Sequence, residues 1–190
     1  MGRPHRSIEP SLLYHAGSRG SNRSPIVWDH EDYQSLIGEI GRAVMRHRWS
    51  VLAWCVMPNH HHVVLQAPHG GFSVGFQQIN GNHSRRTNRR YERRAHLFEN
   101  RPWDRELTTV GRLVGTLAYV YRNPVSAGLV ERAEDWPYSS YRQTLGLEPP
   151  AQWLDVHRVR PLFGRTADEL RACLDEHVHR GQVRVSDTGF

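Results

Sequence analysis

Three consecutive histidines, His60, His61 and His62, follow a tight turn and open a run of strand-forming residues. Pro58-Asn59 predicts the turn, because Pro pre-sets φ and Asn tolerates unusual backbone angles. Alternate residues of a strand share a face, so His60 and His62 point one way and His61 points the other. Two imidazoles on one face suit a divalent metal ion. The strand-forming runs on either side of the turn are Val51–Val56 and Val63–Leu65.

A site with only two histidine ligands fits catalysis better than structure. A structural zinc ion needs four ligands, and three consecutive histidines of one strand cannot share a metal without distorting it. A histidine pair with one oxygen ligand and phosphate oxygens would accept Mg²⁺ or Mn²⁺, which then acts as a Lewis acid on a phosphoryl oxygen. On the triplet alone, a polar turn with three exposed histidines explains the sequence equally well.

A polar stripe on a predicted helix further along the chain offers a nucleophile. Arg112, Thr116, Tyr119 and Asn123 recur at three- and four-residue spacing, which places them on one helical face. The sequence has neither a nucleophile-elbow serine motif nor a phosphate-cradling Gly-rich loop, so Tyr119 is a candidate covalent nucleophile. Asn123, one turn on, can supply an amide oxygen as a third metal ligand. The alternative for a lone helical tyrosine is core packing.

The charge of the chain favours a polyanionic partner. The formal net charge is +6 with a pI of about 9.9, and all basic residues are Arg. Arg binds phosphate through a planar fork, so nucleic acid is the first partner to consider. The segment Arg85–Arg94 holds six Arg with almost no compensating acid, and the loop Gly17–Arg23 adds two more. A solvated helix end and an ordinary Gly/Ser loop are the alternatives.

The elements that must position these residues are read from periodicity and from caps. Asp29 is a predicted N-cap, Thr108 or Thr109 caps a later helix, and Pro124 is expected to stop that helix at Asn123. The resulting order predicts an α+β fold: a ferredoxin-like sandwich with helices on one face of an antiparallel sheet. The expected elements are strands over Ser11–Ala16 and His96–Trp103, a hairpin over Trp49–Gln66, and helices over Asp29–Arg48, Phe72–Arg94, Thr109–Asn123, Asp155–Phe163 and Ala167–Arg180.

The length predicts one domain over residues 1–145 with a small helical C-terminal extension over residues 146–190. Cys55 and Cys173 give no disulfide framework, and Cys55 is expected to be a buried thiol. No apolar stretch is long enough for a signal peptide or a membrane span, so we expect a cytoplasmic protein without a membrane partner.

Two blocks together carry a family resemblance. Met57–His62 and the downstream block Tyr119–Val130 are similar to the REP-associated tyrosine transposases, within the IS200-like superfamily of single-tyrosine HUH transposases. The resemblance extends from about Tyr14 to Arg142. Supporting stretches lie at residues 18–23, 88–98 and 136–141.

This resemblance implies a ferredoxin-like fold in which His60, His62 and Asn123 bind Mg²⁺ or Mn²⁺. Tyr119 would attack a DNA phosphate and leave a 5′-phosphotyrosine bond and a free 3′-OH. The substrate would be single-stranded DNA beside a hairpin, in a nucleoid-associated monomer or homodimer. The basic residues expected to bind the DNA are Arg19, Arg23, Arg85, Arg86, Arg89, Arg90, Arg93, Arg94 and Arg112.

The sequence departs from the family pattern at three positions. His61 replaces a usually apolar residue, which could weaken strand packing or change the metal preference, and Ala95 stands where Gly is common. Tyr121 replaces a frequent His and is a rival nucleophile, but it lies off the stripe of Asn123, so Tyr119 is preferred. A non-catalytic or domesticated nucleic-acid-binding protein is the alternative function. The complete set of ligands and nucleophile favours the enzyme.

Overall fold

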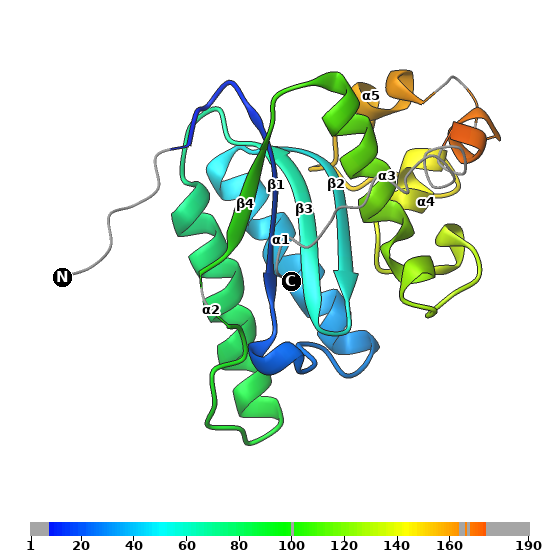
Figure 1. Ribbon diagram of the computed structural model, residues 1–190. Helices are drawn as coiled ribbons and strands as arrows, with labels where there is room; N and C mark the ends of the chain where they lie inside the picture. Colours follow the sequence, from blue (N-terminus) through cyan, green and yellow to red (C-terminus); the bar gives the residue numbers. More distant parts are fainter. Residues whose placement is uncertain (1–7, 100, 164–165, 167, 174–190) are drawn as a thin grey trace.

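In the computed structural model, which describes residues 8–99, 101–163, 166 and 168–173, four strands form one antiparallel sheet (Figure 1). The sheet order is β2-β3-β1-β4. Helix α1 connects β1 to β2 and α2 connects β3 to β4, so the predicted α+β, ferredoxin-like fold is confirmed. The strands are β1 (Leu13–Arg19), β2 (Ser50–Met57), β3 (His60–Gln66) and β4 (Trp103–Leu107). The helices are α1 (His30–His47), α2 (Phe72–Arg90), α3 (Val110–Ser126), α4 (Tyr141–Leu145) and α5 (Val156–Val159), with 3₁₀ turns at Ser21–Arg23, Ala133–Asp135 and Arg160–Leu162.

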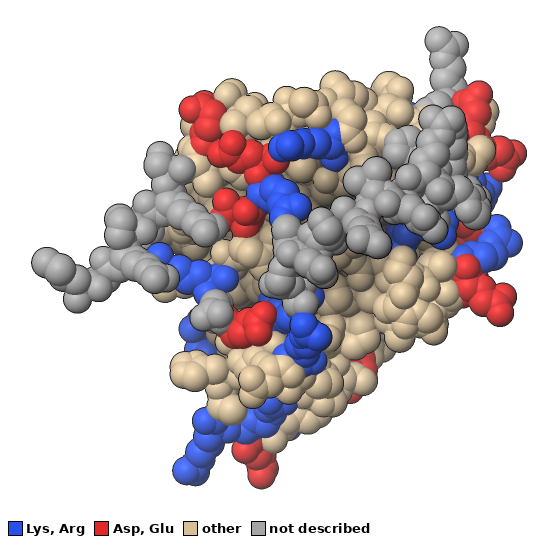
Figure 2. All heavy atoms as spheres, in the orientation of Figure 1, with Lys and Arg blue, Asp and Glu red and all other residues tan. Residues whose placement is uncertain are grey.

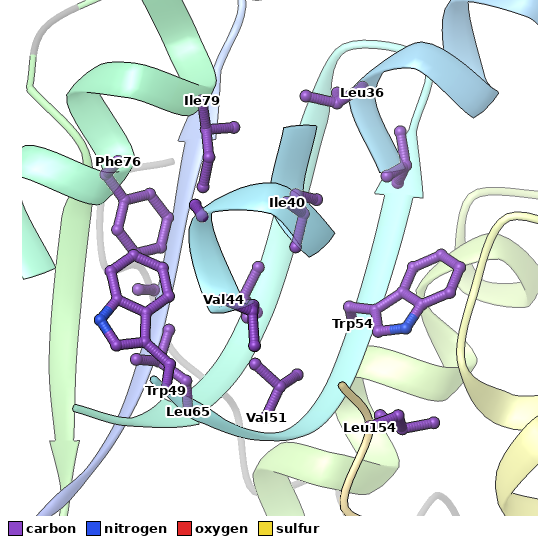
Figure 3. Close-up of a cluster of buried hydrophobic side chains, with 14 of the residues drawn as sticks. Leu36, Ile40, Val44, Trp49, Val51, Trp54, Leu65, Phe76, Ile79 and Leu154 are labelled. Carbon is purple, nitrogen blue, oxygen red and sulfur yellow. The ribbon is translucent and has the colours of Figure 1, made fainter. Parts of the chain in front are cut away.

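Helices α1 and α2 pack together against one face of the sheet. The Asp29 side chain caps α1 by accepting a 3.1 Å hydrogen bond from the Asp32 backbone N–H, as predicted. Apolar residues at helical spacing then face the sheet and form a large buried cluster with alternate residues of β2 and β3 (Figure 3). The labelled members of this cluster are Leu36, Ile40, Val44, Trp49, Val51, Trp54, Leu65, Phe76, Ile79 and Leu154.

Helix α3 covers the opposite face of the sheet, beside β2 (Figure 1). Leu113, Leu117 and Val120 pack there against the other set of alternate residues, including Leu52 and Cys55 of β2. The expectation that all helices lie on one face is therefore wrong for α3. The spacing of its apolar stripe predicts a buried side but not which face of the sheet the stripe meets.

Three predicted boundaries are also corrected. The fourth strand begins at Trp103 rather than ending there, because Pro102 has no N–H for the ladder and the pairing with β1 runs from Trp103 to Leu107. Phe98 makes only an isolated bridge to Gly20. Helix α2 ends at Arg90 instead of Arg94. Helix α3 continues past Pro124 to Ser126, because a proline in the last turn interrupts few helical hydrogen bonds.

Two later segments cover the outer edge of β2. The Tyr138 carbonyl accepts a 2.9 Å hydrogen bond from the Val56 N–H, and the Ser140 hydroxyl accepts one of 3.0 Å from the Trp54 N–H. Leu154 forms a bridge with Val51. The edge of the sheet is thereby protected from pairing with another chain.

The C-terminal extension is only partly described. The predicted helix over Asp155–Phe163 is observed as α5 followed by a 3₁₀ turn. Of the helix predicted over Ala167–Arg180, residues 168–173 are helical, and residues 167 and 174–180 lie outside the described residues. The domain boundary after residue 145 stays a prediction. Within the described part of the chain, no helix combines the length and hydropathy needed to cross a membrane.

Candidate active site

The β2–β3 hairpin presents His60 and His62 on the face of the sheet that α3 covers. Met57 pairs with His60, so Pro58-Asn59 is the two-residue turn that the sequence predicts. The two imidazole rings lie 4.7 Å apart between centroids and meet nearly at right angles, at 87°. This arrangement brings two nitrogen donors together on one rigid strand.

Asn123 of α3 reaches the same point from the opposite layer. Its amide nitrogen lies 3.1 Å from His62 Nε2, and the same side chain is close enough to His60 to influence the pKa of that imidazole. The Asn123 side chain is held in place because its residue is 8% exposed and the helix packs on β2. Strand and helix together therefore join the three side chains that the sequence nominated as metal ligands.

Burial keeps both histidines in the form that binds metals. Burial and the nearby Arg19 guanidinium lower the pKa of His60 to about 4. Burial, followed by the neighbouring His15 and His60 rings, lowers the pKa of His62 well below its ordinary value. Both imidazoles are neutral at physiological pH, so each has a nitrogen lone pair available to a cation.

The donor set can be tested against the chemistry of a divalent ion. Among residues 8–99, 101–163, 166 and 168–173, no group of three or more His, Cys, Asp or Glu side chains is arranged to hold a metal. An ion at this point would rely on His60, His62 and the Asn123 amide, with its other positions left for water or substrate. Such an open, mixed nitrogen and oxygen set fits Mg²⁺ or Mn²⁺ during catalysis but not a closed structural zinc site.

Tyr119 lies one helical turn before Asn123 and lines the site. Its ring centroid is 5.5 Å from that of His62, and the residue is 40% exposed. Tyr121 is fully buried on another side of α3, where its hydroxyl is 3.0 Å from Thr144 Oγ1. Burial raises the pKa of Tyr121 to about 12. Of these two tyrosines, only Tyr119 combines an accessible ring with contact to His62.

Two residues of this site were not predicted, His15 of β1 and Trp103 of β4. The His15 ring stacks on His62 at 5.0 Å and has its Nε2 3.0 Å from His62 Nδ1. The Trp103 ring meets His15 edge-on at 4.7 Å. Gly17 makes room for that ring, since a Cβ at this position would lie 2.6 Å from it. Burial and then Arg105 lower the pKa of His15 to about 3, so its ring is also neutral.

His61 points to the other face, as predicted, and does not contact the candidate ligands through its side chain. Its Nε2 lies 3.4 Å from Asn80 Oδ1, and the Asn80 amide donates a 2.8 Å hydrogen bond to Ser18 Oγ. Its ring is stacked on Phe76 at 6.2 Å and meets Phe98 edge-on. His61 thus fills the usual apolar position as a packed, hydrogen-bonded core residue.

The Arg-rich end of α2 is more compensated than the sequence suggests. Arg86 and Arg90 form ion pairs with the start of α1, where both contact the buried Asp32 at 3.0 and 2.6 Å. They also pair with Glu31, and Arg90 pairs with Asp29. Burial opposes ionisation of Asp32, but hydrogen bonds from Tyr91 and from these Arg side chains lower its pKa overall. These two arginines therefore fasten α2 to α1.

The other candidate DNA ligands are placed differently. Arg93 lies over the Trp28 ring at 4.9 Å, and Arg85 hydrogen-bonds to Asn82. Arg19 ends β1 opposite His60, and Arg23 ends the 3₁₀ turn that follows. Three further candidates have exposed side chains, and Figure 2 shows basic side chains mixed with acidic ones at the tip where α2 ends. The exposed three are Arg89, Arg94 and Arg112.

A groove runs between α2 and the segment that leads into β4. It is lined on the helix side by Arg85 and Asn88 and on the other side by Phe98 and Trp103. Because the Trp103 ring also contacts His15 and His62, the groove leads to the edge of the site. Aromatic and Arg side chains along one groove suit unpaired nucleotides.

Comparison with known proteins gives three related findings. The family model for IS200-like transposases matches residues 10–112. A putative REP-associated tyrosine transposase of Haemophilus influenzae is 27% identical over 117 residues, which is 55% of this chain and 66%, just under two thirds, of that protein. The REP-associated tyrosine transposase of Escherichia coli K12 is 26% identical over 121 residues, 62% of this chain and 70% of that protein.

A solved structure supports the fold. The structure of a REP-associated tyrosine transposase bound to a REP hairpin superposes with a TM-score of 0.63 at 24% identity, and the match covers 82% of this chain and 93% of that one. At this identity the match establishes the shared architecture of sheet and helices.

Proposed function

Because the chain belongs to the IS200-like transposase family, we propose that it nicks and rejoins single-stranded DNA with Tyr119 as the nucleophile. In this proposal His60, His62 and Asn123 hold Mg²⁺ or Mn²⁺ beside the scissile phosphate. The observation that carries the proposal is the position of Tyr119. Its accessible ring rests against His62, one helical turn from Asn123.

The reaction exchanges one phosphodiester for another. Tyr119 Oη gives up its proton and attacks the phosphorus, the bond from phosphorus to the 3′ oxygen breaks, and that oxygen leaves as a hydroxyl after taking up a proton. The DNA 5′ end is then joined to Tyr119. A bound divalent ion would supply Lewis-acid polarisation of the phosphate. Attack by a 3′-OH on the phosphotyrosine reverses the step, so the bond energy is kept and no ATP is required.

The side chains around Tyr119 support this role. His62 and His15 pack against the tyrosine ring, at centroid distances of 5.5 and 5.9 Å, and fix its approach to the site. Such preorganisation contributes to catalysis because the reacting groups need no ordering at the moment of reaction. Helix α3 carries both the nucleophile and Asn123, so one rigid element sets the distance between them.

The proposed substrate is a DNA hairpin with a single-stranded flank. The similar solved protein is bound to a REP hairpin, and the groove beside α2 gives this chain a surface for unpaired nucleotides. Phe98 and Trp103 would stack on bases, while Arg85 and the exposed Arg89 and Arg94 would contact phosphates. Arg86 and Arg90 are poorer candidates, because acidic side chains of α1 occupy their guanidinium groups.

The test uses an end-labelled oligonucleotide that carries an imperfect hairpin and a single-stranded flank. Incubation with the protein and Mg²⁺ or Mn²⁺ should give a covalent protein–DNA adduct that survives denaturing electrophoresis. The adduct should not form when EDTA is present during the incubation. The adduct should be lost in Tyr119→Phe and kept in Tyr121→Phe. Tight binding of the hairpin without any adduct, over several hairpin sequences and both ions, would instead indicate a non-catalytic DNA-binding protein.

A further inference from the structure

His62 is hydrogen-bonded at both ring nitrogens. Its Nε2 faces Asn123 Nδ2 at 3.1 Å, and its Nδ1 faces His15 Nε2 at 3.0 Å. The Asn123 amide nitrogen can only donate, so His62 Nε2 accepts and carries the lone pair. His62 Nδ1 then carries the hydrogen and donates it to His15 Nε2. This chain of donors assigns one tautomer to His62.

His60 shows the same pattern with a different partner. Its Nδ1 lies 2.6 Å from Asn59 Oδ1, an atom that can only accept, so the hydrogen of His60 is on Nδ1. In both histidines Nε2 is therefore the nitrogen with the lone pair. Histidines that bind metals commonly donate their other ring N–H to a neighbouring acceptor, which fixes the ring and raises its basicity.

The acceptor for His62 is itself rigid. His15 lies on the central strand β1, two residues before Gly17, the residue that pairs with His62. Its side chain is therefore on the same face as His62 and diagonal to it. The Trp103 ring meets the His15 ring edge-on at 4.7 Å, and His15 is only 8% exposed. Nothing about this position needs a histidine for the fold, since an apolar side chain would suit a buried strand.

We propose that His15 is a positioning residue, which accepts the Nδ1–H of His62 and so holds His62 Nε2 toward Asn123 and the divalent ion. This inference rests on the proposed metal site. It assigns to β1 a part in a metal site whose proposed ligands come from β3 and α3. Removing a residue that hydrogen-bonds to a metal-binding histidine typically weakens metal binding by about 10- to 100-fold.

The first test measures Mn²⁺ binding by isothermal titration calorimetry without DNA. Four proteins are compared: the unaltered chain, His15→Phe, His15→Gln and His62→Ala. His15→Phe keeps a ring against Trp103 but removes the acceptor, so its affinity for Mn²⁺ should fall by about 10- to 100-fold. His15→Gln places an amide oxygen near the position of Nε2 and should recover most of that loss.

The second test reads the tautomer directly, on metal-free protein. Imidazole ¹⁵N–¹H correlation spectra should show His62 with its hydrogen on Nδ1 in the unaltered chain and in His15→Gln. In His15→Phe that single tautomer should give way to a mixture. Circular dichroism and the thermal midpoint identify any variant that has lost its fold, and the spectra of the unaltered chain test the assignment without any variant.

The possible failures are distinguishable. If the unaltered chain has no Mn²⁺ affinity that His62→Ala removes, the proposed metal site is wrong and the role of His15 falls with it. If that affinity exists but His15→Phe binds Mn²⁺ as tightly as the unaltered chain, only the role of His15 is overturned. A His62 hydrogen found on Nε2 in the metal-free unaltered chain would overturn it as well.

Discussion

The two faces of strand β3 carry the same residue type in different surroundings. On the α3 face, His60 lies against His62, and the His62 ring contacts the Asn123 amide, the Tyr119 ring and the His15 ring. On the face of α1 and α2, His61 is 0% exposed, packs on Phe76 and, among the described residues, has a single side-chain hydrogen bond of 3.4 Å. Residue type is therefore a poor guide to function here. The role of each histidine depends on the side chains that pack against it on its face of the sheet.

His61 and His62 are buried and His60 is partly buried, but all three are held neutral, so charge does not separate them. Burial lowers the pKa of His61 to about 3, and it also lowers the pKa values of His60 and His62. The three histidines differ in the hydrogen-bond partner of their Nδ1 atom. Within the described residues His61 Nδ1 has no hydrogen-bond partner, whereas His60 and His62 both have an acceptor at Nδ1. An oriented lone pair distinguishes a potential ligand from a core residue.

The largest effect is expected on the α3 face, from His62→Ala. The ion's stabilisation of the reacting phosphate is worth several kcal/mol, so adduct formation should fall by about 1000-fold or more. The rate of adduct formation at saturating Mn²⁺ measures this loss. His61→Ala is the matched change on the other face, and equal loss of rate in both folded variants would remove the distinction between the faces.

Asn123→Ala should have the second largest effect. It removes one of three protein donors but leaves both histidines, so we expect Mn²⁺ affinity to fall by at least about 100-fold, the largest loss typical when only a hydrogen-bond partner of a metal ligand is removed. Titration calorimetry gives the affinity, and raising the Mn²⁺ concentration should restore part of the adduct yield. An unchanged affinity would show that the ion is held without α3.

On the face of α1 and α2, the buried His83 should make the free energy of unfolding depend on pH. Burial lowers the pKa of His83, which donates a 2.7 Å hydrogen bond to the Ile26 carbonyl. Below about pH 6.5, His83 binds a proton in the unfolded chain but stays neutral in the folded chain. The stability that His83 contributes is therefore present above that pH and is lost on acidification.

Each such histidine contributes a slope of up to about 1.4 kcal/mol per pH unit. His83→Gln keeps a donor for Ile26 but cannot titrate, so urea unfolding between pH 7 and 5 should show a smaller loss of stability in this variant. The same slope in both proteins would mean that His83 is not held neutral by the fold.

The smallest functional effect is expected from His61→Leu. This change restores an apolar residue and removes an unpartnered buried nitrogen, so the free energy of unfolding should rise by about 1 kcal/mol. The rate of adduct formation and the Mn²⁺ affinity should stay as they are. A clear drop in either, with the fold intact, would place His61 in the site and break the comparison.

Local patterns predicted the parts of this site that lie close in sequence. Strand alternation separated His61 from the outer pair, and helical spacing joined Tyr119 to Asn123. Long-range pairing lies beyond such patterns. His15 enters the site only because β1 lies between β3 and β4, and no spacing in the sequence states which strands are neighbours.

The lack of long-range information in local patterns also explains where the expectations from the sequence differ from the structure. The stripe of α3 shows a buried side, yet its sheet face depends on how the chain leaves β4. Arg86 and Arg90 look uncompensated because their acidic partners, Asp29, Glu31 and Asp32, are more than fifty residues away in sequence. Pro124 resembles a stop signal, but a last-turn proline costs α3 little.

The most direct measurement is to locate the DNA on the protein. The adduct formed with Mn²⁺ is treated with nuclease and trypsin, and the peptide Leu113–Arg122, which contains both tyrosines, is sequenced by tandem mass spectrometry. We predict a nucleotide-bearing phosphate on Tyr119 and an unmodified Tyr121. A modified Tyr121, or an adduct on a residue outside this peptide, would contradict the assignment of the α3 face as the active site.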